Sequence, residues 1–418
     1  MPETSPKQVL DGTSTSGVAL MEGSLRNYAW GSRTALAELT GRPSPSPHPE
    51  AELWYGAHPE APSALPGARP GESADLLQRI SADPDSELGD SATGGRLPFL
   101  LKLLAADQAL SLQAHPTLDQ AREGYARENE AGVPLGSPSR NYKDDNHKPE
   151  LLVGLTRFEA LAGFRPVERT RALLAALGVP ELDRYTDLLS GVAGDAEGLR
   201  ALVTTWISLP PQRRLELIDA VLDACRRLIA AVDEGTAEVW MAGPAQAALD
   251  LSEQHPGDAG ILVSLLLNHV VLEPGQALFL AAGNLHAYLK GTGVEVMANS
   301  NNVLRGGLTT KHVDVPELMK VVDFSATPDP VQRPREDGTF IVPVPEFRLR
   351  AVDGSTVDVQ GPSIVLATEG SVEVGGADGR GVVLAAGQAA WVPASSSDVT
   401  ARPVASGDSG QFFVASVG

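Results

Sequence analysis

A glutamine and a histidine lie two positions apart in the apolar stretch ALSLQAHPTLDQ, which covers residues 109–120. If this stretch is a strand, Gln113 and His115 point to the same face, because side chains alternate between the two faces of a strand. Two polar side chains inside an apolar β-lined cavity cost free energy unless a partner satisfies them. A divalent metal ion is such a partner, so the spacing suggests a metal site.

Two further candidate ligands lie later in the chain. Glu150 opens the apolar run ELLVG, and His286 ends the stretch GQALFLAAGNLH. Two imidazoles, one carboxylate and one amide oxygen suit zinc, with a coordination position left for water or substrate oxygens. A single anionic ligand leaves zinc a net positive charge and strong Lewis acidity. Taken alone, Gln113 and His115 fit hydrogen-bonded core residues better, and the metal interpretation is favoured only when His286 joins them.

Three basic residues lie close in sequence to these candidates. Lys148 is two residues before Glu150, and Arg305 and Lys311 follow His286 in a loop rich in glycine and asparagine. Phosphate is the ligand that fits them, since arginine offers paired donors and lysine a mobile point charge. The alternative is that they are solvated surface charges, which is the commoner outcome for any single lysine.

The composition limits the partners and the compartment. The 418 residues include 33 basic and 53 acidic ones, and the net charge of −20 argues against nucleic acid or an anionic membrane as a partner. The single cysteine, Cys225, excludes an internal disulfide and a thiolate zinc cluster. The N-terminal stretch lacks the pattern of a signal peptide, and the apolar run from Ile261 is too short to span a bilayer. We expect a cytoplasmic protein.

The elements that must position these residues change in character along the chain. Residues 21–165 contain short apolar runs between turn-rich loops, which is typical of strands with irregular connections. Residues 166–255 have helical periodicity. Residues 256–326 return to strands after one more helix, and the valine-rich runs of 327–418 predict a small sandwich or jelly roll.

An internal repeat links the two β regions. GQALFLAAGNLHA, from Gly275, aligns without gaps with GQAAWVPASSSDV, from Gly387. The first copy resembles the second cupin motif, which ends in a metal-binding histidine, although Ala281 stands at the usual proline. The second copy restores the proline but has Asp398 at the histidine position, so we expect no metal there.

We therefore expect a mainly β protein with α: two cupin-like (jelly-roll) β domains plus an inserted all-helical domain. The expected parts are an N-terminal tail (1–20), a catalytic cupin domain (21–165 and 256–326), a helical insertion (166–255) and a metal-free C-terminal cupin-like domain (327–418).

Six ordered stretches carry a resemblance to a known family. They are LRNYAWGSRTALAELTG, AELWYGAHPEAPS, LPFLLKLLAADQALSLQAHP, NYKDDNHKPELLVGLTRFEALAGFR, GDAGILVSLLLNHVVLEPGQALFLAAGNLHAYL and GVEVMANSNNVLRGGLTTKHVDVPEL. In these stretches the chain resembles the type I mannose-6-phosphate isomerases, also called phosphomannose isomerases. The resemblance implies an aldose–ketose isomerase that interconverts mannose 6-phosphate and fructose 6-phosphate, with one zinc ion per chain. It implies a hexose 6-phosphate as the partner, and we expect a monomer.

The resemblance also implies roles for individual residues. The zinc ligands fall on Gln113, His115, Glu150 and His286. The catalytic arginine falls on Arg305, active-site lysines on Lys148 and Lys311, pocket positions on Glu295 and Tyr288, and a serine near the phosphate on Ser111. One departure stands out, because Asn301 occupies the place of the family's usual aspartate.

Isomerisation requires a base to move a proton between C1 and C2, and the sequence leaves Lys148 and Glu295 as rival candidates. Zinc and Arg305 would stabilise the negative charge that develops. Two other classes are weighed: a non-catalytic cupin that binds a phosphorylated sugar through its metal, and an iron-dependent cupin oxygenase. The retained basic residues argue against the first, and the presence of only two well-placed histidines argues against the second.

Overall fold

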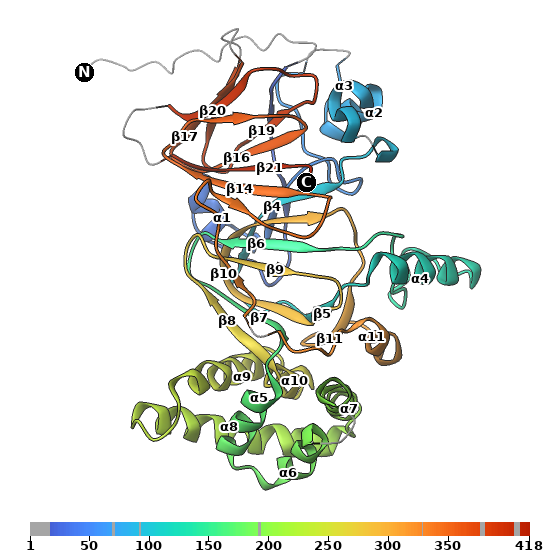
Figure 1. Ribbon diagram of the computed structural model, residues 1–418, viewed down its shortest axis with the longest axis vertical. Helices are drawn as coiled ribbons and strands as arrows, with labels where there is room; N and C mark the ends of the chain where they lie inside the picture. Colours follow the sequence, from blue (N-terminus) through green and yellow to red (C-terminus); the bar gives the residue numbers. More distant parts are fainter. Residues whose placement is uncertain are drawn as a thin grey trace. The chain divides into compact units, whose positions relative to one another are not determined.

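The computed structural model describes residues 17–68, 72–91, 93–190, 194–327, 329–376, 381–404 and 410–418 (Figure 1). By its contacts the chain divides into two compact units. The first comprises the described residues of 1–28, 33–104 and 334–418, and the second comprises 29–32 and 105–333. This division differs from the domain boundaries expected from the sequence, because residues 33–104 group with the C-terminal segment and 166–255 group with the strands of the second unit. Of the expected tail, residues 1–16 lie outside the described residues, and Ala19 and Leu20 already belong to a strand.

Two antiparallel sheets make up much of the first unit. Their strands are β1 (Ala19–Met21), β13 (Thr339–Phe340), β14 (Arg348–Asp353), β15 (Val357–Val359), β16 (Ser363–Glu369), β17 (Ser371–Gly375), β18 (Gly381–Ala385), β19 (Ala389–Val392), β20 (Val399–Pro403) and β21 (Gln411–Ser416). One sheet has the order β1-β19-β16-β21-β14-β13 and the other the order β15-β20-β17-β18. Alternation along these strands, as in SVEVG of β17, places valines such as Val372 and Val374 in an apolar core to which both sheets contribute.

The rest of the first unit is a three-stranded antiparallel ladder with short helices. These elements are β2 (Ser24–Arg26), α1 (Ala35–Leu39), β3 (Glu52–Tyr55), α2 (Leu76–Ala82), α3 (Pro84–Leu88), η1 (Gly89–Ser91), η2 (Thr93–Gly95) and β4 (Phe99–Ala106), whose last two residues belong to the second unit.

In the described residues of the second unit there are eight strands, of which the longest is β10 (His286–Ala298). The others are β5 (Leu112–Ala114), β6 (Glu150–Gly154), β7 (Phe158–Phe164), β8 (Leu267–Leu272), β9 (Ala277–Leu280), β11 (Leu304–Gly307) and β12 (Val331–Gln332). The first part of β10 pairs with β5 and β7, and its last part pairs with β6. β10 therefore connects both groups of strands in this unit.

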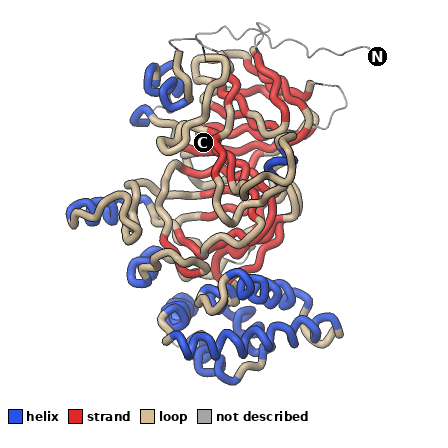
Figure 2. Tube along the Cα trace, turned by 180° about the vertical axis from the view of Figure 1, so that it is seen from behind, coloured by secondary structure: helices blue, strands red, loops and turns tan. Residues whose placement is uncertain are grey.

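Most helices of the second unit gather on one side of its strands (Figures 1 and 2). They are α5 (Val167–Leu177), α6 (Pro180–Thr186), η3 (Asp187–Ser190), α7 (Asp195–Ile207), α8 (Pro211–Asp233), η4 (Val239–Met241), α9 (Ala242–Gln254) and α10 (Gly260–Ser264). Their apolar faces form a single core with residues of β5, β7, β8, β10 and β11. Cys225 is buried in this core, and burial raises the pKa of its thiol to about 12, as expected of an inert apolar residue.

The helix α4 (Leu118–Glu130) stands apart from that group, whereas the short helix α11 (Val315–Val321) contributes Leu318, Met319 and Val321 to the same core. α4 falls in the region where the sequence predicted strands with irregular connections, so that description was incomplete. The helix has only two buried residues, Ala121 and Gly124, which is why apolar periodicity did not reveal it. A capping box between Thr117 and Gln120 fixes its first turn.

None of the helices in the described part of the chain combines the length and the hydropathy needed to cross a bilayer.

Candidate metal centre and active site

Strand register brings three of the predicted site residues into one row. Gln113 of β5 lies opposite His286 of β10 on one side and opposite Arg305 of β11 on the other. Residues directly opposite each other in antiparallel strands project to the same face, with Cβ atoms about 5 Å apart. The pairing therefore places an amide, an imidazole and a guanidinium on one surface, from segments that span almost 200 positions of sequence.

The sequence neighbours of these three polar residues project to the opposite face of the strands. Leu112, Ala114, Ala287 and Leu304 are the neighbours of Gln113, His286 and Arg305 in these strands, and all four are buried in the core shared with the helices. Alternation thus gives each strand one polar face and one face packed on α5–α10. The helices support the strands from behind, and the polar face is left for the site.

Glu150 and Glu295 come to one face through the pairing of β6 with β10. Glu150 lies opposite Met297, and Leu152 lies opposite Glu295, so the two glutamates project to the same side of the ladder. The ladder of β10 with β7 has an irregularity after Tyr288, and Gly291 follows with φ +133°. A side chain at position 291 would also meet the ring of Phe158 at 2.7 Å, so glycine is required at this point of the strand.

The side chains of four predicted ligands lie together in the structure. Ligand atoms of His115, Glu150 and His286, all buried, lie within 4.8 Å of one another. Nε2 of His115 is 3.4 Å from Oε1 of Glu150, and Nε2 of His286 is 3.5 Å from Oε2 of the same carboxylate. Gln113 Nε2 lies 3.4 Å from His286 Nε2, and its amide also carries Oε1, an oxygen that can bind a metal.

Hydrogen bonds to main-chain carbonyls fix the tautomer of both histidines. Nδ1 of His115 donates to the carbonyl of Asn302 (2.7 Å), and Nδ1 of His286 donates to the carbonyl of Asn284 (2.9 Å). In this tautomer the lone pair of each Nε2 is directed toward Glu150. Among the buried atoms of the described residues, His115 Nε2 and Glu150 Oε2 make no hydrogen bond. A lone pair facing a carboxylate is repulsive unless a cation lies between them, so these residues fit a bound metal ion.

The charge states agree with this arrangement. Burial is the main cause that lowers the pKa of His115, to about 4, so the ring is neutral near pH 7. Burial alone would raise the pKa of Glu150, but the opposing effects, of which the charge of Lys148 is the largest, outweigh it and hold that pKa well below its usual range. A neutral imidazole and an ionised carboxylate are the forms that bind a metal.

The predicted basic residues lie around this group. Lys148 Nζ is 2.8 Å from Glu150 Oε1, and both side chains are buried. Arg305 is half-buried on β11, and desolvation lowers its pKa. Desolvation and then the charge of Arg305 lower the pKa of Lys311, which lies in the exposed turn after β11. The charge of Arg305 also lowers the pKa of Lys143, after larger effects of desolvation and Arg140.

The remaining predicted residues have the following positions. Tyr288 donates from its hydroxyl to Oε1 of Glu295 at 2.9 Å, and both side chains are buried. Ser111 is half-buried and directly precedes β5. Asn301, the departure from the family pattern, is half-buried, and its N–H donates to Oδ2 of Asp144 at 2.7 Å.

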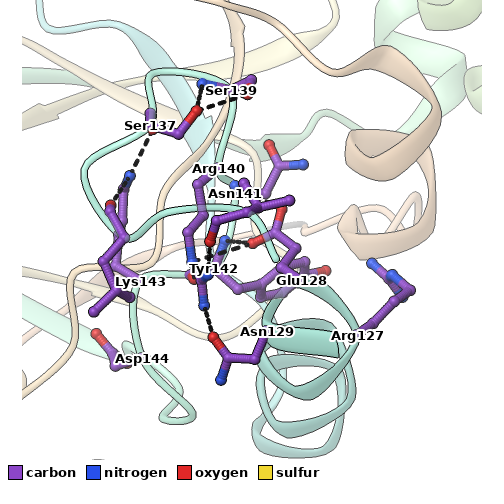
Figure 3. A network of polar contacts seen from close by, with 12 residues as sticks. Arg127, Glu128, Asn129, Ser137, Ser139, Arg140, Asn141, Tyr142, Lys143 and Asp144 are labelled. Carbon is purple, nitrogen blue, oxygen red and sulfur yellow. Dashed lines mark hydrogen bonds and ion pairs between the residues drawn. The ribbon is translucent and has the colours of Figure 1, made fainter. Parts of the chain in front are cut away.

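The segment between α4 and β6, which leads to Lys148, is organised by the buried guanidinium of Arg140 (Figure 3). It donates to the carbonyl of Tyr142 (2.6 Å), to Oδ1 of Asn129 (2.7 Å) and to the carbonyl of Val133. Glu128, at the end of α4, accepts the N–H groups of Asn141 (2.9 Å) and Tyr142 (2.8 Å).

Replacing Arg140 by methionine is expected to destabilise the protein by about 3 kcal/mol, because it removes the donor to the carbonyls of Tyr142 and Val133 and to Asn129, together with the cation that lies 3.6 Å from Glu128. Urea unfolding of the purified protein measures the change. Arg226→Met is the matched control, since Arg226 makes only an exposed ion pair with Asp223. Equal stability of the Arg140 and Arg226 variants would show that the buried network contributes little.

Sequence reasoning gave no role to Asn284, Asn302 or Asp144 in holding the histidines. Asn284 and Asn302 act through main-chain carbonyls, which every residue type carries. His286 and Asn284 are two residues apart, so their hydrogen bond could have been predicted from the local sequence. The bond between His115 and Asn302 could not, because these residues are 187 positions apart.

Comparisons with known proteins identify the family. The model of the phosphomannose isomerase type I catalytic domain matches residues 19–167. Mannose-6-phosphate isomerase of Escherichia coli is 38% identical over 392 residues, covering 91% of this chain and 95% of that protein. The mannose-6-phosphate isomerase of Mus musculus is 33% identical over 383 residues, covering 83% and 86%.

Solved structures agree. A crystal structure of mannose 6-phosphate isomerase bound with zinc and yttrium matches with a TM-score of 0.83 and 35% identity, covering 96% of this chain and 99% of that one. A mutant of phosphomannose isomerase from Salmonella typhimurium matches with a TM-score of 0.84 and 34% identity over the same shares of the two chains. The chain belongs to the type I phosphomannose isomerase family, which confirms the resemblance found in its six stretches.

Proposed function

We propose that the protein is a zinc-dependent aldose–ketose isomerase that interconverts mannose 6-phosphate and fructose 6-phosphate. The observation that carries the proposal is the buried group of His115, Glu150 and His286, whose Nε2 and carboxylate atoms converge while His115 Nε2 and Glu150 Oε2 make no hydrogen bond, in a chain of this family. Gln113, His115, Glu150 and His286 would hold one zinc ion per chain. When bound, zinc supplies positive charge that polarises sugar oxygens and lowers the cost of negative charge on them.

The residues around the metal group have complementary tasks. Arg305 contributes a fixed positive charge beside Gln113, where negative charge develops on the substrate oxygens. Lys148 or Glu295 moves the proton between C1 and C2. Lys148 is held 2.8 Å from Glu150, and Glu295 is held by the hydroxyl of Tyr288, so each candidate base has a fixed position. Tyr288 then acts as a pocket residue that orients Glu295.

Phosphate binding is assigned to Ser111 and Lys311. Ser111 lies two residues before Gln113, and Lys311 is close enough to Arg305 for the charge of one to affect the pKa of the other. A phosphate held at a distance from the reacting carbons uses its binding energy to position them.

The finer architecture is part of the same proposal. We assign two cupin-like domains, the catalytic one at 21–165 and 256–326 and a metal-free one at 327–418, with a helical insertion at 166–255. The position of Gln113, Glu150 and His286 in β5, β6 and β10, with His115 directly after β5, supports the first assignment. We also assign a cytoplasmic monomer without a nucleic-acid partner, and the net charge of −20 supports the last of these assignments.

The direct test is turnover by purified protein whose zinc content has been measured. Formation of fructose 6-phosphate from mannose 6-phosphate, followed by a coupled assay, is the expected result, and removal of zinc with a chelator should stop it. Tight binding of the sugar phosphate without turnover by fully loaded protein would instead favour a metal-dependent binding protein.

Proton transfer makes a separate prediction about the substrate. Deuterium at C2 of mannose 6-phosphate should be lost to water in part during turnover, because a proton held by a side chain exchanges with solvent. Mass spectrometry of the product measures the loss. Complete retention of deuterium would point to a shielded transfer or a hydride shift, and only the hydride shift would remove the need for Lys148 or Glu295 as the base at C2.

A further inference from the structure

We propose that Asp144 is a positioning residue that holds His115 in the orientation and tautomer required for zinc, acting through the segment Ser300–Asn302. This role rests on the proposed zinc function, so the experiment must distinguish a failure of the positioning role from a failure of the zinc function.

The carboxylate of Asp144 connects two segments that are distant in sequence. Oδ1 accepts the hydroxyl of Ser300 at 2.7 Å and Nδ2 of Asn302 at 3.2 Å, and Oδ2 accepts the N–H of Asn301 at 2.7 Å. A carboxylate has two acceptor oxygens, and here both are in use. The charge makes these hydrogen bonds stronger than those of a neutral acceptor.

Asn302 completes the connection from the other side. It is fully buried, and its Oδ1 accepts the N–H groups of Lys143 (2.6 Å) and Asp144 (3.2 Å). Its Nδ2 donates to the carbonyls of Asp144 (2.9 Å) and Asn146 (2.8 Å). The whole side-chain amide is thus used to tie residues 143–146 to residues 300–302.

This network fixes the position of the main-chain carbonyl of Asn302. The main-chain oxygen of Asn302 accepts Nδ1–H of His115 at 2.7 Å, and this bond leaves the Nε2 lone pair directed at Glu150. A metal-binding histidine depends on such a partner for its tautomer and ring orientation, and loss of the partner typically weakens metal binding 10–100-fold. Asp144 does not touch the metal group, so its effect must pass through Asn302.

The experiment compares Asp144→Asn with Asp145→Asn. Both remove one negative charge from adjacent positions, but Asp145 is exposed. An asparagine at 144 has one acceptor oxygen instead of two, so this side chain loses either the hydrogen bond from Asn301 or those from Ser300 and Asn302. We expect zinc affinity of the full-length protein, measured by competition with a chelator, to fall about 10–100-fold in Asp144→Asn and to stay within about twofold of wild type in Asp145→Asn.

Two further readouts separate positioning from general damage. Nitrogen NMR of the zinc-free protein should show His115 protonated at Nδ1 in the wild type and a mixture of tautomers in Asp144→Asn. Turnover by Asp144→Asn should recover to within a few-fold of wild type at saturating zinc, because the site is weakened rather than removed. A thermal midpoint of the zinc-free variant equal to that of wild type excludes unfolding as the cause.

The outcomes are distinct. Unchanged zinc affinity and an unchanged His115 signal in Asp144→Asn would overturn the positioning role while leaving the isomerase proposal intact. A wild-type protein that binds no zinc would instead overturn the proposed function, and the His115 signal would still report on the role of Asp144. If the thermal midpoint falls, the second variant is Ser300→Ala, which removes the hydroxyl that donates to Asp144 and that also accepts the N–H of Asn302 at 3.2 Å. Equal zinc affinity in this variant and in wild type would also count against the proposal.

Discussion

Replacing His286 by alanine is expected to remove stoichiometric zinc and to abolish turnover. The change deletes one of two buried nitrogen donors and leaves Glu150 facing a cavity. Partners that only orient a ligand are worth about 10–100-fold in metal affinity, so loss of a ligand itself should exceed 100-fold. Metal analysis of the purified variant together with the isomerase assay measures both effects.

The matched control for this change is His269→Ala. His269 is a half-buried histidine of the same unit, but its imidazole lies 3.5 Å from Glu159 and it is not part of the metal group. Zinc content and turnover should remain close to wild type in this variant. A His286→Ala protein that is active and free of zinc would refute the assignment of the ligands.

Replacing Arg305 by alanine is expected to lower kcat by about 10²–10³-fold while zinc remains bound. Desolvation lowers the pKa of this guanidinium, but an arginine remains charged in a protein at neutral pH. A preorganised positive charge of this kind acts mainly on the transition state and typically contributes two to three orders of magnitude, so about 3–4 kcal/mol of barrier is at stake. The structural reason is its place beside Gln113 on the face that carries the metal group.

Kinetics of Arg305→Lys serve as the control. Lysine retains the charge but not the paired donors, so it should restore part of kcat if the charge is what matters. Zinc content should be the same in the wild type and both variants. An unchanged kcat in Arg305→Ala would exclude the residue from the chemistry, and a rise in KM alone would place it in ground-state binding instead.

Local patterns in the sequence account for much of what was predicted correctly about the fold. Alternation along a strand is a property of neighbouring residues, so Gln113 could be assigned to a face opposite that of Leu112 and Ala114, which lie in the core. Helical periodicity is local in the same way, and α5–α9 fall within 166–255 as it predicts. The helix α4 was missed because it buries too little for a periodicity, although Thr117 and Gln120 carry a readable cap.

The sequence was enough to name the residues of the candidate site, but it did not give their arrangement in space. Spacing and family resemblance named four ligands, and the side chains of all four lie together; their role as zinc ligands remains a prediction. The carbonyl that orients His115 belongs to Asn302, 187 positions away. No residue type marks a main-chain acceptor, so this partner could not be inferred from composition or spacing.

The sequence by itself determined the family, the alternating faces of the strands and the kinds of donor available for a metal. The tertiary structure alone decided that β5 lies between β10 and β11, that Asp144 holds Asn302, and that residues 33–104 group with the C-terminal segment. The physical reason is that strand register and hydrogen-bond partners depend on which distant segments pair. That choice is made by the packing of the whole chain, whereas alternation and periodicity are set within a few neighbouring residues.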